Sequence, residues 1–239
     1  MSGHSKWSQI KHKKAITDSR KGKLFSKLSA QIPIAAKSGG DPAMNSNLRL
    51  MIEKARAAGM TKDIIERAIK RGTGELGGAT LESVRYGAIG PAGIAVLIDV
   101  VTDNKNRTVN EIRSIVSKFG GKQTEIGSVS YLFEQQGKIE AKGDPSTALG
   151  AGKEAIQLAA IDAGAIDFQE SDGGVIVYSA PQDLEKVKQA LEQAGAVIVS
   201  AELSMEPKQT VATEEPKATQ LLEALDELDD VTQIYTNLA

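Results

Sequence analysis

The spacing of apolar residues changes partway along the chain, and this change limits the folds that are open to it. Between residues 24 and 72 apolar residues recur at helical intervals, as at Leu24 and Leu28, whereas from Leu81 they form short runs typical of strands. Residues 73–80, between the two patterns, are rich in glycine and form a predicted linker. A helical domain followed by α+β structure is therefore expected.

Three helices are predicted in the first part of the chain. Pro33 kinks or closes the first helix, the second ends at Gly59, and the third runs from a cap at Thr61 to Gly72. Acidic and basic residues four apart favour ion pairs on a helix surface. The positive charge of the third helix is therefore predicted to be mostly neutralised within it, by the pairs Asp63–Arg67 and Glu66–Lys70.

After the linker, strands and helices alternate in an order that predicts two α+β domains, one inserted in the other. Residues 83–88 and 94–101 are expected to form a hairpin, followed by a helix over 104–119 and a strand over 128–134. Residues 137–203 show the order β-α-β-β-α-β, which is the ferredoxin-like split pattern. The last helix and strand of the chain are expected to complete the first α+β domain.

The predicted fold class is α+β and multidomain: an N-terminal three-helix domain and two α+β domains, one ferredoxin-like and inserted in the other. The predicted parts are a basic flexible arm over 1–23, a helical domain over 24–78, an α+β domain over 79–136 and 204–239, and the inserted domain over 137–203.

Positive charge is concentrated at the start of the chain, although the formal net charge is only −2. Residues 1–72 hold 16 Lys and Arg against 5 Asp and Glu, whereas the remainder holds 13 against 26. Within the first 24 residues, seven cations face a single acid, Asp18. Such a surplus is typical of segments that bind a polyanion. Residues 1–20 also lack an apolar stripe, so they are predicted to be an arm that orders on its partner.

The candidate nucleic-acid contacts carry a positive charge or a ring that can stack. Lys and Arg neutralise phosphates, and the single tryptophan either stacks on a base or anchors the arm on the helical domain. A second phosphate contact is expected from Lys105 and Arg107, at the start of a helix, where Thr108 and Glu111 also fit a capping box. The candidates are Lys6, Trp7, Lys11, His12, Lys13, Lys14, Arg20, Lys21, Lys23, Lys27, Arg49, Lys105 and Arg107.

Several blocks of the sequence resemble the YebC/PmpR family: residues 1–7, 10–14, 22–28, 47–55, 86–87, 90–91, 102–108 and 127–129. The resemblance extends over nearly the whole chain and implies a similar three-domain fold. It also implies a bacterial DNA-binding transcriptional regulator, or a translation activator on the ribosome such as the mitochondrial relative that activates translation of cytochrome oxidase subunit one. Because the chain begins at the family's first motif and shows no mitochondrial presequence, a bacterial cytoplasmic member is expected.

Catalysis is not expected, and neither is a cofactor or a metal. The chain has no cysteine, and its two histidines, His4 and His12, lie in the arm without a third ligand. Residues 150–154 superficially resemble a phosphate-binding loop but lack its first glycine and its Ser or Thr. The chain shows no secretory signal and no apolar run of ~20 residues, so no membrane partner is expected.

Three functions remain open on the sequence. The first is a DNA-binding transcriptional regulator that uses the basic arm and the helical domain. The second is a translation factor that binds ribosomal RNA or mRNA, because the same arm can serve either nucleic acid. The third is a protein–protein adaptor that acts through the acidic α+β domains.

Overall fold

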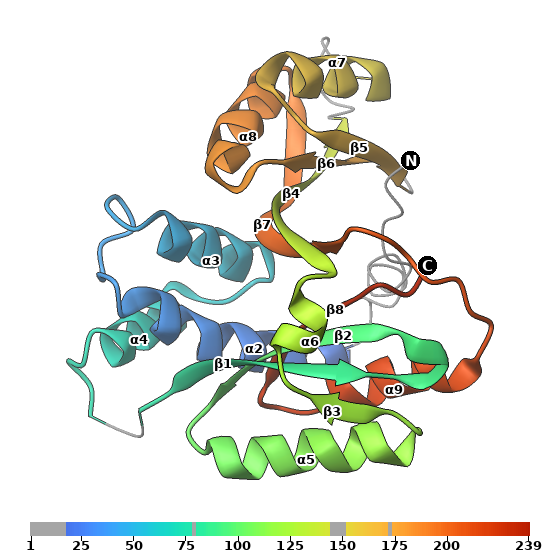
Figure 1. The fold of residues 1–239 in the computed structure, drawn as a ribbon. Helices are drawn as coiled ribbons and strands as arrows, with labels where there is room; N and C mark the ends of the chain where they lie inside the picture. Colours follow the sequence, from blue (N-terminus) through green and yellow to red (C-terminus); the bar gives the residue numbers. More distant parts are fainter. Residues whose placement is uncertain (1–17, 78–79, 144–151, 172–173) are drawn as a thin grey trace. The chain divides into compact units, whose positions relative to one another are not determined.

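The computed structural model describes residues 18–77, 80–143, 152–171 and 174–239 (Figure 1). They form two compact units. The first contains the described residues up to Glu134 together with Glu206–Ala239, and the second contains Gln135–Met205. A helical part is followed by two α+β parts, and the second α+β part interrupts the first, so the predicted fold class is confirmed.

The helical part consists of α2 (Asp18–Ala36), α3 (Ser46–Ala57) and α4 (Lys62–Gly72). Their shared core is built from apolar residues at helical spacing, and its fully or almost fully buried members include Leu28, Ile32, Leu48, Ala55 and Ile65. The Asn45 side chain caps α3 by accepting a hydrogen bond from the Leu48 backbone N–H at 3.0 Å.

Helix α2 is longer at both ends than the sequence indicates. It begins at Asp18, so residues 18–23 of the predicted arm are helical, as their lysine and arginine content permits. It also continues through Pro33 to Ala36. A proline removes one backbone donor, and here the helix ends within a turn of it.

The first sheet has the strand order β3-β1-β2-β8. Strands β1 (Glu82–Ile89) and β2 (Ala95–Thr102) form the expected antiparallel hairpin, and β3 spans Lys122–Thr124. Strand β8 (Val231–Thr236) pairs antiparallel with β2. The end of the chain therefore completes the sheet that begins at β1, as predicted.

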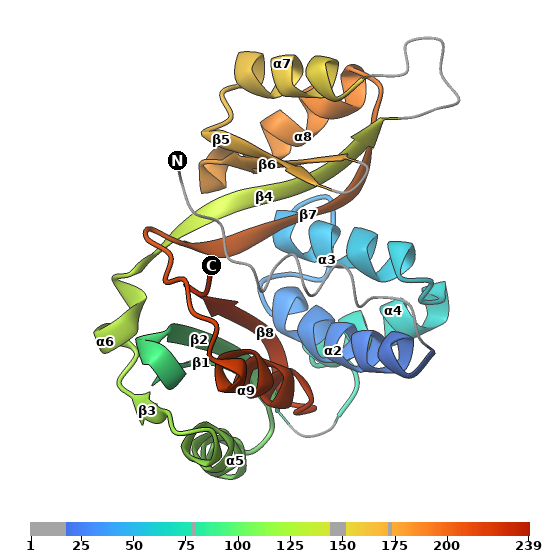
Figure 2. The same cartoon turned by 90° about the vertical axis from the view of Figure 1, so that its right-hand side faces the viewer.

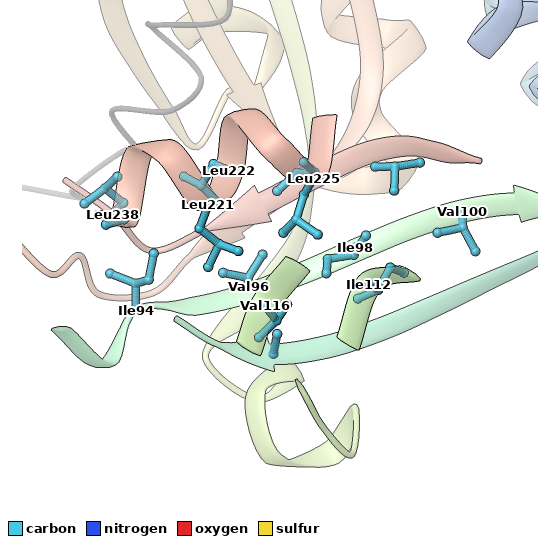
Figure 3. Close-up of a cluster of buried hydrophobic side chains, with 14 residues drawn as sticks. Ile94, Val96, Ile98, Val100, Ile112, Val116, Leu221, Leu222, Leu225 and Leu238 are labelled. Atoms are coloured by element: carbon cyan, nitrogen blue, oxygen red, sulfur yellow. The ribbon is translucent and has the colours of Figure 1, made fainter. Parts of the chain in front are cut away.

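Helices α5 (Lys105–Lys118) and α9 (Pro216–Asp226) cover one face of this sheet. Figure 3 shows Ile94, Val96 and Ile98 reaching toward Leu221, Leu222 and Leu225 of α9, with Ile112 and Val116 supplied by α5. Alternate residues of β2 point into this core. The opposite face of β2 is also buried, as its nearly continuous apolar run indicates.

The strand predicted over 128–134 is wrong except for its last two residues. Residues Gly127–Ser130 form the short helix α6, and the strand β4 begins only at Phe133. The helical turn lets Val129 pack against Gly87 of β1, where an added Cβ would lie 2.8 Å from Val129 Cγ2. A residue with a side chain at position 87 would not leave that space.

The second unit has the ferredoxin-like arrangement. Its sheet order is β5-β6-β4-β7, and α7 and α8 lie side by side (Figure 2). Its elements are β4 (Phe133–Gly143), α7 (Lys153–Ala163), β5 (Asp167–Ser171), β6 (Gly174–Ser179), α8 (Leu184–Gln193) and β7 (Ala196–Pro207).

Replacement of Gly72 by alanine is expected to destabilise the helical part. A Cβ at Gly72 would lie 2.3 Å from the Pro33 carbonyl oxygen and 2.8 Å from Pro33 Cα, so backbone must move. Overpacking of this kind costs about 1–3 kcal/mol, and thermal denaturation followed by circular dichroism measures it. Gly77→Ala is the control, because no atom lies within 4 Å of its Cβ position. Equal stability of the two variants would contradict this packing.

Candidate nucleic-acid interface

Helix α2 carries two lysines that contact the turn between α9 and β8. This turn, residues 226–230, holds Asp226, Glu227, Asp229 and Asp230 and is called the acidic turn below. Lys27 Nζ donates to Asp226 Oδ1 at 2.7 Å and to the Asp226 carbonyl oxygen at 3.0 Å. Lys23 forms an ion pair with Glu227. Both contacts join residues about 200 positions apart, at separations of 199 and 204.

Local structure favours lysines at this place. The acidic turn follows the C-terminal end of α9, where free carbonyl groups and the helix dipole attract cations. Lys23 and Lys27 stand four apart on α2 and so share one of its faces. The negative charge of the acidic turn thus meets positive charge from the segment that directly follows the predicted arm.

Asp230 of the acidic turn accepts three hydrogen bonds from side chains. Its Oδ2 accepts hydrogen bonds from Thr108 Oγ1 at 2.6 Å, from the Arg107 guanidinium at 2.7 Å and from Thr102 Oγ1 at 3.0 Å. Burial by itself raises the pKa of this carboxyl, but the hydrogen bonds from Thr108, Arg107 and Thr102 outweigh it. The pKa of Asp230 therefore lies below its usual value.

The predicted capping box at Thr108 is wrong. The side chain of Asn104 caps α5 by accepting from the Arg107 backbone N–H at 3.1 Å, and Thr108 lies inside the helix. Asn is among the best capping residues, and with Asn104 in that role the buried Thr108 hydroxyl is available to bond Asp230.

The two cations predicted as a second phosphate contact have carboxylate partners within the chain. Lys105 forms an ion pair with Glu82, and hydrogen bonding to Lys105 lowers the pKa of the Glu82 carboxyl. Arg107 pairs with Asp230 and, at 3.2 Å, with Asp103. A phosphate at this position would have to compete with three carboxylates.

The predicted ion pairs on α4 are also wrong. Glu66 pairs with Lys62 at 3.5 Å, in the direction of the helix N-terminus, and not with Lys70. Within the described part of the chain, neither Arg67 nor Lys70 forms an ion pair, and both are exposed. Sequence spacing alone could not identify Lys70 as a free cation, because Glu66 has a lysine four residues away on either side.

Of the remaining candidates, Lys6, Trp7, Lys11, His12, Lys13 and Lys14 lie outside the described residues, as do the side chains of Arg20 and Lys21. Arg49 lies half-buried on α3 and has an interaction partner. The structure therefore brings Lys23, Lys27 and Arg107 together around the acidic turn. Lys105 pairs separately with Glu82 of β1.

A pocket of about 300 Å³ opens beside the acidic turn. Its lining mixes hydroxyl, cationic and anionic groups: Ser26, Ser29, Arg71, Arg107, Asp103, Asp229 and Asp230, among others.

In the described ranges no group of three or more His, Cys, Asp and Glu side chains could hold a metal ion. No helix within those ranges is long and apolar enough to span a bilayer.

Stability is expected to depend on the ionised form of Asp230. Because its folded-state pKa is depressed, its contribution is fully present above the unfolded pKa of about 4 and is lost as the pH falls through the folded value. Asp230→Asn should therefore lower the free energy of unfolding at pH 7 by about 1–2 kcal/mol. Urea denaturation of both proteins at a series of pH values measures the difference.

The difference between the two proteins should shrink as the pH falls below about 4. Asp229→Asn is the matched control, since Asp229 is exposed and its side chain makes no ion pair or hydrogen bond with the described residues. A destabilisation by Asp230→Asn that is the same at every pH would contradict this role.

Comparison with known proteins places the whole chain in one family. Residues 5–75 match the family model described as the N-terminal domain of the TACO1/YebC protein, and residues 81–238 match the model of the TACO1/YebC second and third domain. Two relatives are both described as "Probable transcriptional regulatory protein". That of Acidithiobacillus ferrooxidans is 48% identical over 99% of this chain and 94% of its own length. The relative from Treponema denticola is 46% identical over 100% of this chain and 96% of its own length.

The crystal structure of a conserved hypothetical protein from Aquifex aeolicus is similar in fold. Its TM-score is 0.88 at 43% sequence identity, and the match covers 98% of this chain and 97% of that one. Sequence and structure agree, and the resemblance that the motifs indicate is confirmed: this chain belongs to the YebC/TACO1 family.

Proposed function

We propose that the protein is a non-enzymatic regulator of gene expression that binds nucleic acid through its basic N-terminal third, with duplex DNA as the first candidate ligand. Its proposed place of action is the cytoplasm. The names of the relatives from Acidithiobacillus ferrooxidans and Treponema denticola support a role in transcription.

The observation that carries the proposal is the excess of positive charge in this third of the chain. Residues 22–72 alone hold ten Lys and Arg against four Asp and Glu, and residues 1–21 add six cations against one acid. Among those cations that the structure describes with their side chains, the acidic turn forms ion pairs with Lys23 and Lys27. Arg67 and Lys70 on α4 remain exposed and without an ion pair among the described residues.

The proposed mechanism is neutralisation of the phosphate backbone. Lys and Arg that bind phosphates release condensed counterions, so affinity falls steeply as salt is raised. Contact with about six phosphates would give a slope of log K against log salt near −5 on duplex DNA and near −4 on single strands. Such contacts supply affinity and position but little sequence selectivity.

Substitution of the arm lysines tests this mechanism. Replacing Lys11, Lys13 and Lys14 together with glutamine should make the slope on duplex DNA less steep by about 2.7 and weaken binding roughly tenfold or more at ~150 mM salt. Fluorescence anisotropy of a labelled duplex measures both quantities. The single tryptophan, Trp7, provides a second and label-free signal from the arm.

The control replaces three lysines outside the N-terminal third, Lys122, Lys186 and Lys217, which are exposed. It removes the same total charge and should leave the slope nearly unchanged. Equal losses in the two triple variants would mean that only net charge matters. A chain whose binding shows no dependence on salt would contradict the proposal outright.

RNA is the second candidate ligand, because phosphate contacts do not discriminate between the nucleic acids. Parallel titrations with duplex DNA, single-stranded RNA and ribosomes at ~150 mM salt rank the three. Binding to ribosomes that survives salt able to strip the protein from DNA would favour a role in translation. Capture of a protein partner that survives removal of residues 1–17, with no binding to any nucleic acid, would favour an adaptor.

A further inference from the structure

The two lysines of α2 that reach the acidic turn are held there in different ways. The Lys27 side chain is only 11% exposed and its Nζ contacts two oxygens of Asp226. Among the described residues, the Lys23 ammonium contacts the carboxylate of Glu227, whose side chain is 71% exposed. Lys27 is therefore an anchor between α2 and the end of α9, whereas the Lys23 contact is accessible from solvent.

An exposed ion pair contributes little to stability, because water and salt compete for both charges. Another anion can replace the carboxylate of such a pair without disturbing the fold. A phosphate of a nucleic acid carries the same kind of anionic oxygen and also gains from the release of its own counterions. Lys23 is the last of the seven cations in the first 24 residues. A nucleic acid whose phosphates bind the other six is therefore expected to reach Lys23 as well.

We propose that Glu227 is an internal competitor that occupies Lys23 until nucleic acid displaces it. Phosphate takes Lys23 from Glu227, while Lys27 stays on Asp226 and keeps α2 in place. The acidic turn thus weakens the binding of nucleic acid and raises the ligand concentration at which the arm becomes occupied. This inference rests on the proposed function, since it concerns the regulation of the same surface.

The test compares two single neutralisations in the acidic turn of the full chain. Glu227→Gln removes the competitor, and Asp229→Asn removes the same charge from an exposed side chain that makes no ion pair with the described residues. With a labelled duplex of about 20 base pairs at ~150 mM salt, Glu227→Gln should bind about two- to fivefold more tightly than Asp229→Asn.

The salt dependence provides a second reading. In the unsubstituted chain, nucleic acid that binds Lys23 frees the Glu227 carboxylate, which then takes up a counterion from solution. This uptake offsets part of the counterion release from the phosphates. The slope of Glu227→Gln should therefore be steeper than that of Asp229→Asn, by up to about 0.9. Glu227 is largely exposed, so thermal denaturation should show both variants folded to the same degree.

Replacement of Lys23, alone and together with Glu227→Gln, completes a double-mutant cycle. Lys23→Gln should cost less affinity in the unsubstituted chain than in the Glu227→Gln background, and the gain from Glu227→Gln should vanish when Lys23 is absent. A gain that persists without Lys23, or one no larger than that of Asp229→Asn, overturns the competitor role while the proposed function stands. A chain that binds no nucleic acid at any salt overturns both.

Discussion

The pairing of β8 with β2 is the constraint on which the first unit depends. Register pairs such as Val96–Thr236 and Ile98–Ile234 make the end of the chain the edge strand of the first sheet, next to β2. Three leucines of α9 then close the core over β2 (Figure 3). Burial of side chains of this size stabilises by about 1.5–3 kcal/mol each. The first unit is therefore complete only when the chain segments before and after the inserted ferredoxin-like unit are both present.

The same pairing places the acidic turn in contact with the basic helix α2. Because β8 is a strand of the sheet and α9 packs on a face of that sheet, the turn between them meets Lys23 and Lys27 of α2 and also Thr102, Arg107 and Thr108. Three carboxylates of the acidic turn thus differ in how far their ion pairs are exposed to solvent. Asp226 and Asp230 hold structure through short, partly buried contacts, whereas Glu227 contacts a lysine where solvent can reach it.

The fold was largely predictable because its signals are periodic and local. Helical spacing around Leu28, the hairpin turn before Ile94 and the β-α-β-β-α-β order all have direct sequence signatures. The helix at Gly127–Ser130 had none, and its Val129 packs against Gly87, which lies 40 positions or more earlier in the sequence. Charge partners were harder still. Glu66 had two lysines within reach, and Lys23 meets a carboxylate 204 residues away. The candidate contacts at residues 6–14 stay predictions.

Whether the basic N-terminal third binds nucleic acid can be tested by crosslinking in living cells, followed by sequencing of the attached nucleic acid and mapping of the crosslinked peptides. We expect nucleic acid to be recovered and its crosslinks to fall on peptides of residues 1–72, where the positive charge exceeds the negative by eleven. Crosslinks confined to residues 135–205, or protein alone in the recovered material, would contradict it.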